Sequence, residues 1–266
     1  MATMHEVDFE ILGDDMQFVR VILDPGEAAI AEAGGMMYVE QGIEMDTIFG
    51  DGSAEQKGFM GKLVGAGKRL LTGESLFMTV FHNEATERRA VAFAAPYPGK
   101  IQPLHLKDLG GEIIAQKDSF LAAAKGVSVG IAFNRRFGAG LFGGEGFIMQ
   151  RLTGDGWIFC HAGGTLEEKT LGPNDVLRVD TGCIVAMQPS ISYDIQFVGK
   201  LKTALFGGEG LFFATLRGPG RVWLQSLPFS RLASRIYAAA PQTGGARREE
   251  GSLLGGLGNL LDGDGR

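Results

Sequence analysis

The segment from Gly65 to Arg69 is the first place where the sequence could do chemistry, because its Gly-Ala-Gly-Lys-Arg order resembles a phosphate-binding loop. A loop of that kind needs a glycine five residues before the Gly-Lys pair and a serine or threonine after it to hold Mg²⁺. Lys62 stands at the first of these positions and Arg69 at the second. The sequence therefore predicts no nucleotide site here.

The histidines and cysteines give no metal-binding pattern either. His5, His82, His105 and His161 are isolated from one another, and no Cys-x-x-Cys or His-x-x-x-His spacing occurs. Cys160 and His161 are neighbours, but adjacent residues of a strand point to opposite faces and cannot chelate together. We expect Cys160 to be a small core residue, His161 to lie on the other face, and the protein to hold no metal or other cofactor.

An acidic residue recurs beside glycine at three places, Glu74, Glu145 and Glu209. One interpretation is a ring of three carboxylates; the alternative, which we favour, is a turn acid that pairs with a nearby base or with backbone amides. A serine follows only Glu74, and the Gly-x-Ser-x-Gly pattern of serine hydrolases is absent from the sequence. We therefore expect no enzymatic activity and no catalytic residue.

Basic residues precede each of these acids. They are Lys68, Arg69, Arg135, Arg136, Lys200 and Lys202. The simpler interpretation is solvation and ion pairing between units, which contributes little for exposed pairs, about 0–1 kcal/mol. The sharper hypothesis is an anion-binding rim for lipid headgroups or RNA.

The segments that carry these acids show that one motif is written three times. Residues 141–147 (Leu-Phe-Gly-Gly-Glu-Gly-Phe) recur as 205–211, and 71–76 is a weaker copy. A fainter match lies upstream, at 36–38, 121–123 and 184–186. Internal repetition of this kind indicates a repeated structural unit. We expect units at about 1–104, 105–171 and 172–237.

The residue types of each unit favour strands. An apolar run follows each acid, and in the second and third copies a short glycine-rich turn and another apolar run come next, which is a hairpin signal. Glycine makes up 42 of 266 residues, so turns are frequent. A unit of this size buries too little surface alone. We therefore predict an all-β domain, residues 1–237, in which three copies share a core around a pseudo-threefold axis.

Two segments depart from the strand pattern. Residues 58–71 fit a short helix or a loop, and Pro228 to Tyr237 predicts a helix with Phe229, Leu232 and Ile236 on one face. Residues 238–266 are predicted to be a Gly/Leu-rich flexible tail that orders only against a partner, because its glycines disfavour a helix.

Composition and charge set wider limits. The formal net charge of −6 argues against a surface built throughout to neutralise phosphates. The N-terminus does not read as a secretory signal, and no apolar stretch is long enough to span a bilayer. With only two cysteines, Cys160 and Cys183, we expect two buried free thiols and a cytoplasmic location.

Consecutive apolar residues point to self-assembly. Runs such as Phe147-Ile148-Met149 place apolar side chains on both faces of a strand, so both faces need cover. We expect part of that cover to come from a second copy. The prediction is a homo-oligomer, ring-like or trimeric with a trimer favoured, and Phe142 and Phe206 are its candidate interface residues.

Taken together, several short motifs resemble those of one family. They are Pro25-Gly26-Glu27, residues 32–36 (Glu-Ala-Gly-Gly-Met), 72–77 (Thr-Gly-Glu-Ser-Leu-Phe), 207–212 (Gly-Gly-Glu-Gly-Leu-Phe) and 218–223 (Gly-Pro-Gly-Arg-Val-Trp). In this order they are similar to the altered-inheritance-of-mitochondria protein family, over residues 4 to about 237. The resemblance implies three β-sandwich units of short double-stranded β-helix type, similar to the tryptophan RNA-binding attenuation protein. It also implies no established activity for prokaryotic members and, for fungal ones, a link to mitochondrial inner-membrane organisation.

The resulting hypothesis is a non-enzymatic, self-assembling β-scaffold or binding protein whose biochemical role and protein partner the sequence does not name. The alternative is a peripheral binder of anionic surfaces that uses the repeated basic pairs. Similarity to an RNA-binding fold carries little weight for RNA, since fold does not fix function. Salt-dependent binding to liposomes or RNA distinguishes the two hypotheses.

Overall fold

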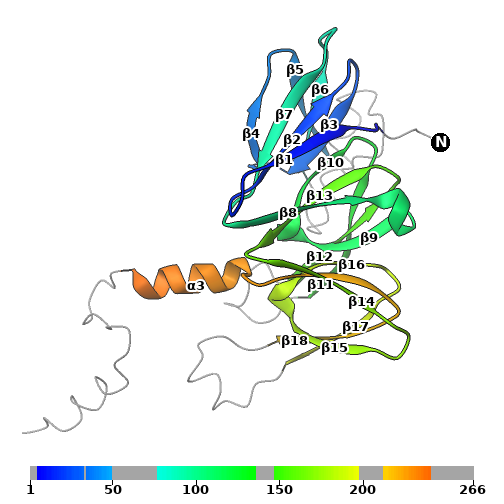
Figure 1. Cartoon of the computed structure of the whole chain (residues 1–266), viewed down its shortest axis with the longest axis vertical. Helices are drawn as coiled ribbons and strands as arrows, with labels where there is room; N and C mark the ends of the chain where they lie inside the picture. Colours follow the sequence, from blue (N-terminus) through cyan, green and yellow to red (C-terminus); the bar gives the residue numbers. More distant parts are fainter. Residues whose placement is uncertain (1–4, 33, 50–76, 136–146, 198–211, 241–266) are drawn as a thin grey trace, which may run out of the picture. The chain divides into compact units, whose positions relative to one another are not determined.

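The computed structural model describes residues 5–32, 34–49, 77–135, 147–197 and 212–240. The chain divides into two compact units, residues 1–230 and 231–266. The described part of the first unit is mostly β-strand, arranged in antiparallel sheets (Figure 1). This confirms the mostly β class that the glycine-punctuated apolar runs predicted.

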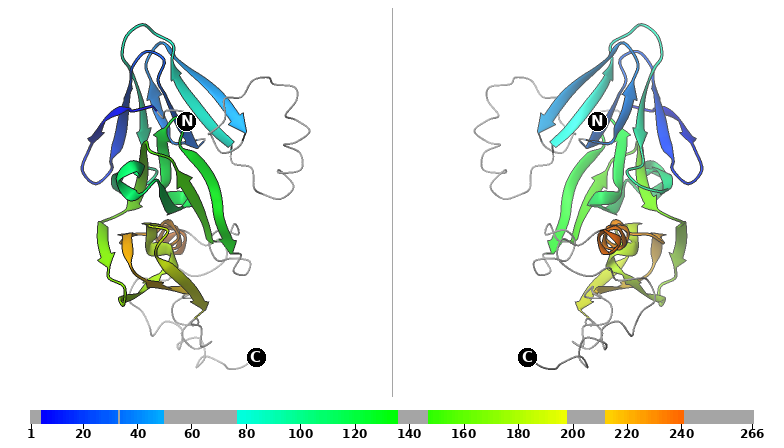
Figure 2. Two further views of the ribbon diagram at one scale, coloured as in Figure 1. Left: turned by 90° about the vertical axis from the view of Figure 1, so that its right-hand side faces the viewer. Right: turned by 90° about the vertical axis from the view of Figure 1, so that its left-hand side faces the viewer.

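The strands form four sheets, which we call A to D. Sheet A has the order β1 (Asp8–Leu12), β2 (Phe18–Leu23), β7 (Arg89–Ala94), β4 (Met36–Val39). Sheet B has the order β5 (Ile43–Phe49), β6 (Phe77–Asn83), β3 (Ala28–Glu32), β10 (Phe120–Ala124), β13 (Trp157–Gly163), β8 (Gly99–His105). The pairing of β5 with β6 is visible from two sides in Figure 2.

Sheet C repeats the six-stranded arrangement. Its order is β11 (Ser128–Arg135), β12 (Phe147–Thr153), β9 (Glu112–Gln116), β16 (Ile184–Met187), β19 (Gly220–Gln225), β14 (Leu166–Leu171). Sheet D has three strands, in the order β15 (Val176–Asp180), β18 (Phe212–Arg217), β17 (Ser192–Phe197). Short 3₁₀ helices, η1 (Leu106–Leu109), η2 (Lys117–Ser119) and η4 (Thr181–Cys183), connect some of the strands.

Three hydrophobic cores lie between successive sheets. The first core takes its side chains from sheets A and B, including Leu23 and Phe159. The middle core joins sheets B and C, with Ile158 and Trp223 among its members, and the last core joins sheets C and D, with Met149 and Leu216. Sheets B and C are therefore covered on both faces, whereas sheets A and D each contribute to one core.

The strand sequences reflect this difference. In β2, Val19, Val21 and Leu23 are buried and alternate with half-buried residues, which is typical of a sheet with one covered face. In β10, every residue from Phe120 to Ala124 is buried, and three of the five are alanine. Small side chains suit a strand that is enclosed on both faces and paired along both edges.

The helix and the cysteines were largely predicted. The helix α3 spans Phe229–Ala239, so it ends slightly beyond the predicted Tyr237. Cys160 is buried in the middle core, as expected, and forms no disulfide with Cys183. The expectation that both thiols are buried is wrong for Cys183, which is only half-buried.

Two further expectations concern the segment 58–71 with the C-terminal tail, and the lack of a stretch that could span a membrane. The segment 58–71 and the tail from residue 241 onward lie outside the described residues. Within the described ranges, no helix combines the length and apolarity needed to cross a membrane.

Candidate functional site

The site residues predicted from the sequence fall where the structure gives no account of their side chains. Outside the described residues lie the basic residues Lys68, Arg69, Arg136, Lys200 and Lys202, the acids Glu74, Glu145 and Glu209, and the interface candidates Phe142 and Phe206. Arg135 is the last residue of β11, and only its backbone is described. The anion-binding rim and the ring of carboxylates stay predictions.

The four histidines do not gather into a metal-binding cluster. Among the described residues, no group of three or more His, Cys, Asp and Glu side chains could hold a metal ion. His5 accepts a hydrogen bond on Nδ1 from the Ala28 N–H at 2.7 Å, and burial is the main cause that lowers its pKa. His82 Nε2 lies 3.2 Å from the Gly26 carbonyl oxygen.

His161 is the most enclosed of these histidines, at 1% exposure. The Tyr97 ring meets it edge-on, with 4.4 Å between the ring centroids, and neither imidazole nitrogen has a hydrogen-bond partner of good geometry. Burial lowers the pKa of His161 to about 4, so the ring is neutral at pH 7. Cys160 and His161 do point to opposite faces, as predicted for strand neighbours, but β13 is buried on both faces.

A small pocket lies beside the stacked rings of His105 and Trp157, whose centroids are 4.7 Å apart. Its lining also includes His5, Lys107 and Asp155. The volume is about 70 Å³, room for roughly two water molecules and well below the ~300 Å³ of a typical small-molecule site. The pocket fits water or a small ion rather than an organic substrate.

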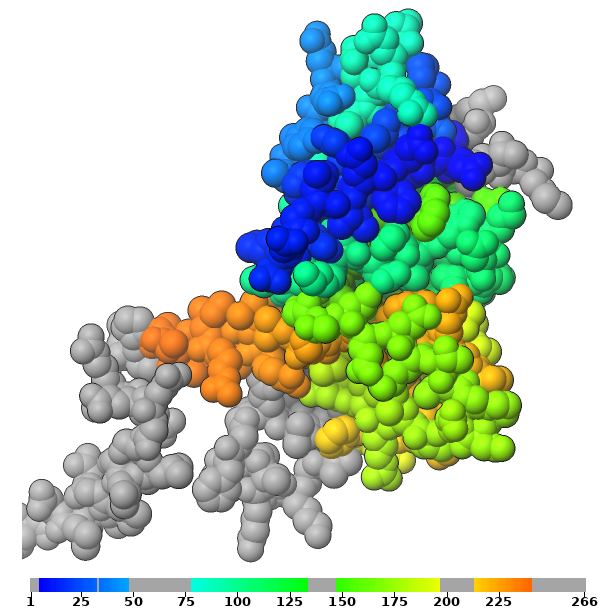
Figure 3. Space-filling model, in the orientation of Figure 1, coloured from blue at the N-terminus to red at the C-terminus, as the bar shows by residue number. Residues whose placement is uncertain are grey.

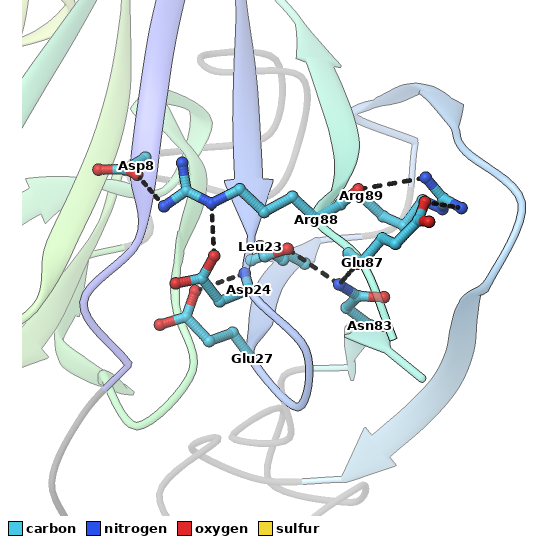
Figure 4. A network of polar contacts seen from close by, with 8 residues as sticks. All are labelled: Asp8, Leu23, Asp24, Glu27, Asn83, Glu87, Arg88 and Arg89. Carbon is cyan, nitrogen blue, oxygen red and sulfur yellow. Dashed lines mark hydrogen bonds and ion pairs between the residues drawn. The ribbon is translucent and has the colours of Figure 1, made fainter. Parts of the chain in front are cut away.

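Exposed ion pairs fasten the turns at one end of sheet A (Figure 4). Arg88 donates to Asp24 Oδ1 at 2.5 Å and to Asp8 Oδ2 at 2.7 Å. Asn83 is fully buried and donates to the carbonyl oxygens of Leu23 and Glu87, both at 2.9 Å. These contacts join turns that follow β2 and β6 to β1, so their role is structural.

Two junctions inside the chain join strands that are distant in sequence. In sheet B, β3 pairs antiparallel with β10, and Ala31 lies opposite Ala122. In sheet C, β9 pairs antiparallel with β16, and Ala115 lies opposite Ala186. All four alanines are fully buried. Each six-stranded sheet is thus two three-stranded halves joined at such a junction.

Strand β4 is an edge of sheet A with apolar side chains left in solvent. Met36 and Met37 are 41% and 54% exposed. The N-terminal strands of sheet A, in blue, form part of the surface in Figure 3. Strand β15 is an edge of sheet D, and its Val176 is 52% exposed. An edge strand with unpaired backbone groups and exposed apolar residues is a template for another strand.

We take these two edges, β4 and β15, as the candidate functional site. Sequence reasoning did not single them out. The signal that could have found them is the faint upstream match of residues 36–38 with 121–123 and 184–186. The bulges of β4, β10 and β16 move the second segment of this match by one residue, so that Met37 and Tyr38 stand against Leu121-Ala122 and Val185-Ala186. Larger side chains at the first copy mark a strand that the chain itself does not enclose.

Comparisons with known proteins agree with this architecture. A family model described as "Mitochondrial biogenesis AIM24" matches residues 9–227. The solved structure of protein SPYM3_0169 from Streptococcus pyogenes is similar with a TM-score of 0.66 and 23% sequence identity, over 88% of this chain and 100% of that one. At this identity the likeness shows the fold alone. A comparison with curated proteins found no match. Because the family model covers most of its length, the chain belongs to the AIM24 family.

Proposed function

We propose that this AIM24 family protein, whose biochemical function is unknown, is a non-enzymatic β-scaffold that assembles with copies of itself. One observation carries the proposal: sheets A and D are incomplete at edges that correspond to the joined edges of sheets B and C. Exposed methionines and a valine at these edges make isolation unfavourable, since apolar area is stabilised by removal from water. A second copy of the chain supplies both an unpaired strand edge and apolar side chains that can cover these residues.

We further propose that the chain is a triplicated unit. Strands β2, β8 and β14 pair with β7, β13 and β19, and β3, β9 and β15 pair with β6, β12 and β18. The same correspondence holds for β4, β10 and β16 and for β5, β11 and β17. These pairings support units that run from β2 to β7, β8 to β13 and β14 to β19, with boundaries slightly upstream of residues 104 and 171.

The pseudo-threefold axis expected from the sequence requires a further contact. If three units closed on one another within one chain, β4 would have to meet β15 of the same chain. In the described strands these two edges do not pair with each other, and sheets A and D are separate. Closure within one chain and joining between chains therefore make different experimental predictions.

Light scattering coupled to size-exclusion chromatography of the full chain at micromolar concentration tests self-assembly. We expect a mass that is a whole-number multiple of 28.3 kDa, with a trimer favoured. The exposed apolar edges predict that this assembly withstands added salt, because hydrophobic burial is not screened. A mass of 28.3 kDa across the accessible concentration range would contradict the proposed function.

A further inference from the structure

The two internal junctions provide a template for the open edges. In both, the third strand of one unit pairs antiparallel with the second strand of the unit before it: β10 pairs with β3, and β16 pairs with β9. Each of these strands has a β-bulge against its neighbour in its own unit. In β10 the bulge lies between Phe120 and Ala122, opposite β13, and in β16 it lies between Ile184 and Ala186, opposite β19. The residue after the bulge is Ala122 in β10 and Ala186 in β16, and each lies opposite an alanine across the junction.

Strand β4 has the same local form. It also has a β-bulge against its neighbour β7, between Met36 and Tyr38. Tyr38 therefore corresponds to Ala122 and Ala186. Because a β-bulge is a specific feature of a strand, the shared position fixes the correspondence residue by residue.

Strand β15 corresponds in the same way to β3 and β9. Ala31 lies opposite Thr79, Ala115 opposite Gln150, and Val179 opposite Ala214. Thr79, Gln150 and Ala214 each stand five residues after the repeated acids at 74, 145 and 209. Val179 is thus the counterpart of Ala31 and Ala115.

We infer that β15 of one copy pairs antiparallel with β4 of a second copy, with Tyr38 opposite Val179 and Val39 opposite Arg178. This inference rests on the proposed self-assembly and names its contact. It joins the three strands of sheet D to the four strands of sheet A in the way that the halves of sheets B and C are joined.

The faces of the two strands agree with this register. Val39 packs against the first core, so Tyr38, its strand neighbour, points to the uncovered face of sheet A. Val179 belongs to the last core. Residues directly opposite each other on paired strands share a face, so Tyr38 extends the last core of the neighbouring copy, and Arg178 extends over the first core beside Val39.

The contact uses a different surface on each copy. Such a head-to-tail contact leaves β4 free at one end and β15 free at the other until the copies close into a ring. Every ring member then has both edges paired, which removes the exposed edge strands. A closed ring of defined size is therefore the expected product.

Lysine substitution with a matched control tests the surface. Met37→Lys places a charge on β4, where a neighbouring strand would bury it, and should reduce the mass measured by light scattering to that of one chain. Met45→Lys is the control, because Met45 is equally exposed, at 52%, on β5, whose counterparts β11 and β17 are also sheet edges. It should leave the assembly intact.

Each result separates the two proposals. An assembly that survives Met37→Lys, or that both lysines disrupt alike, overturns the pairing of β4 and leaves self-assembly standing. A wild-type protein that is a single chain overturns both. Circular dichroism of each variant shows that the fold is retained, which exposed positions favour.

Cysteine cross-linking tests the register. In a Cys183→Ser background, Val39→Cys chains are mixed with Arg178→Cys chains and treated with a mild oxidant, or with a short bismaleimide if the disulfide geometry is poor. About half of the chains should become linked in pairs, one of each kind, because random mixing in a head-to-tail ring gives each chain the required neighbour half of the time. Thr47→Cys with Arg178→Cys, which places the first thiol on exposed β5, should give no such product.

A single chain that carries both Val39→Cys and Arg178→Cys distinguishes pairing of β4 with β15 between copies from pairing within one chain. Our inference expects products of several linked chains. A product of single-chain mass that carries an internal link would show that β4 and β15 meet within one chain, and would overturn the contact between copies.

Discussion

In the triplicated unit that we propose, the internal junctions and the outer edges of this protein are the same structural element in two settings. At the junctions, facing residues are small and fully buried, as with Ala31 and Ala122. At the outer edges, the corresponding positions hold Tyr38 and Val179, with Met37 and Arg178 beside them. The difference teaches that the covering of a strand selects its residues. In the assembly that we propose, the large apolar residues of the open edge pack against a strand of a second copy.

The largest expected effect on stability comes from placing arginine, the residue at position 178 of β15, at the buried position 114 of β9. Ile114 and Arg178 are corresponding residues of β9 and β15, and Ile114 is buried in the last core. Ile114→Arg leaves an uncompensated charge in that core and should reduce the free energy of unfolding by roughly 3–5 kcal/mol. Arg178→Ile should change it by less than about 0.5 kcal/mol, because Arg178 is exposed in the single chain.

Urea unfolding of both variants measures this contrast, at a concentration where the chain is not assembled. Similar losses for Ile114→Arg and Arg178→Ile would show that the two positions are not in different environments.

The second prediction compares two buried polar residues on the strands β13 and β19. His161 in β13 and Gln225 in β19 correspond, but Gln225 has hydrogen-bond partners on both sides of its amide, and His161 does not. The pKa of His161 falls to about 4 in the folded chain from 6.5. The unfolded chain therefore binds a proton more readily, and stability decreases as the pH falls from 6.5 through about 4, by about 3 kcal/mol in total.

Replacing His161 with the residue found at the corresponding position tests this. His161→Gln should remove that part of the pH dependence and leave the contribution of His5 in place. The measurement is the free energy of unfolding of both proteins from pH 7 to pH 4. Parallel curves would contradict a neutral, enclosed His161.

A smaller loss should follow from removing the hydrogen bonds of the buried Gln225 side chain in β19. Gln225 accepts from the Gly163 N–H at 2.7 Å and donates to the Gly182 carbonyl at 2.8 Å. Gln225→Ala leaves both buried backbone groups without these bonds and should cost about 2 kcal/mol of unfolding free energy. Gln225→Met is the control for size, because it keeps the length of the side chain and removes both hydrogen bonds; an unchanged denaturation midpoint for the alanine variant would exclude a structural role.

The smallest effect is expected at the exposed ion pairs. Arg88 bridges Asp8 and Asp24 in solvent, where water and salt compete for the same charges. Arg88→Ala should leave the unfolding midpoint unchanged within error and should not alter the oligomeric mass. A clear destabilisation would mean that this surface, rather than the cores, holds sheet A in place.

The sequence predicted what depends on neighbours along the chain. The strands β12 and β13 follow from two apolar runs around Gly154-Asp155-Gly156, and the helix α3 follows from its apolar spacing. The burial of Cys160 was predicted for the same reason. These features are local, so local residue patterns determine them. The hairpin that the two apolar runs predicted is wrong, because β12 pairs in sheet C and β13 pairs in sheet B, so the turn between them connects two sheets.

The parts that were missed depend on distant contacts. Nothing near Ala31 indicates that Ala122, far along the chain, lies opposite it. The enclosure of His161 on the face away from Cys160 was likewise missed, because a single strand does not show that a second sheet covers it. The predicted sites at Glu74, Arg69 and Phe142 lie outside the described residues, so they stay predictions.

Hydrogen exchange at several protein concentrations tests the central claim most directly. The amides of β3, β10, β9 and β16 should be protected at every concentration, because their junctions lie within one chain. The outward amides of β4 and β15 should be protected only at concentrations where the copies assemble, and should exchange quickly on dilution. Equal exchange of β4 and β15 in the assembled and dissociated protein would contradict the account.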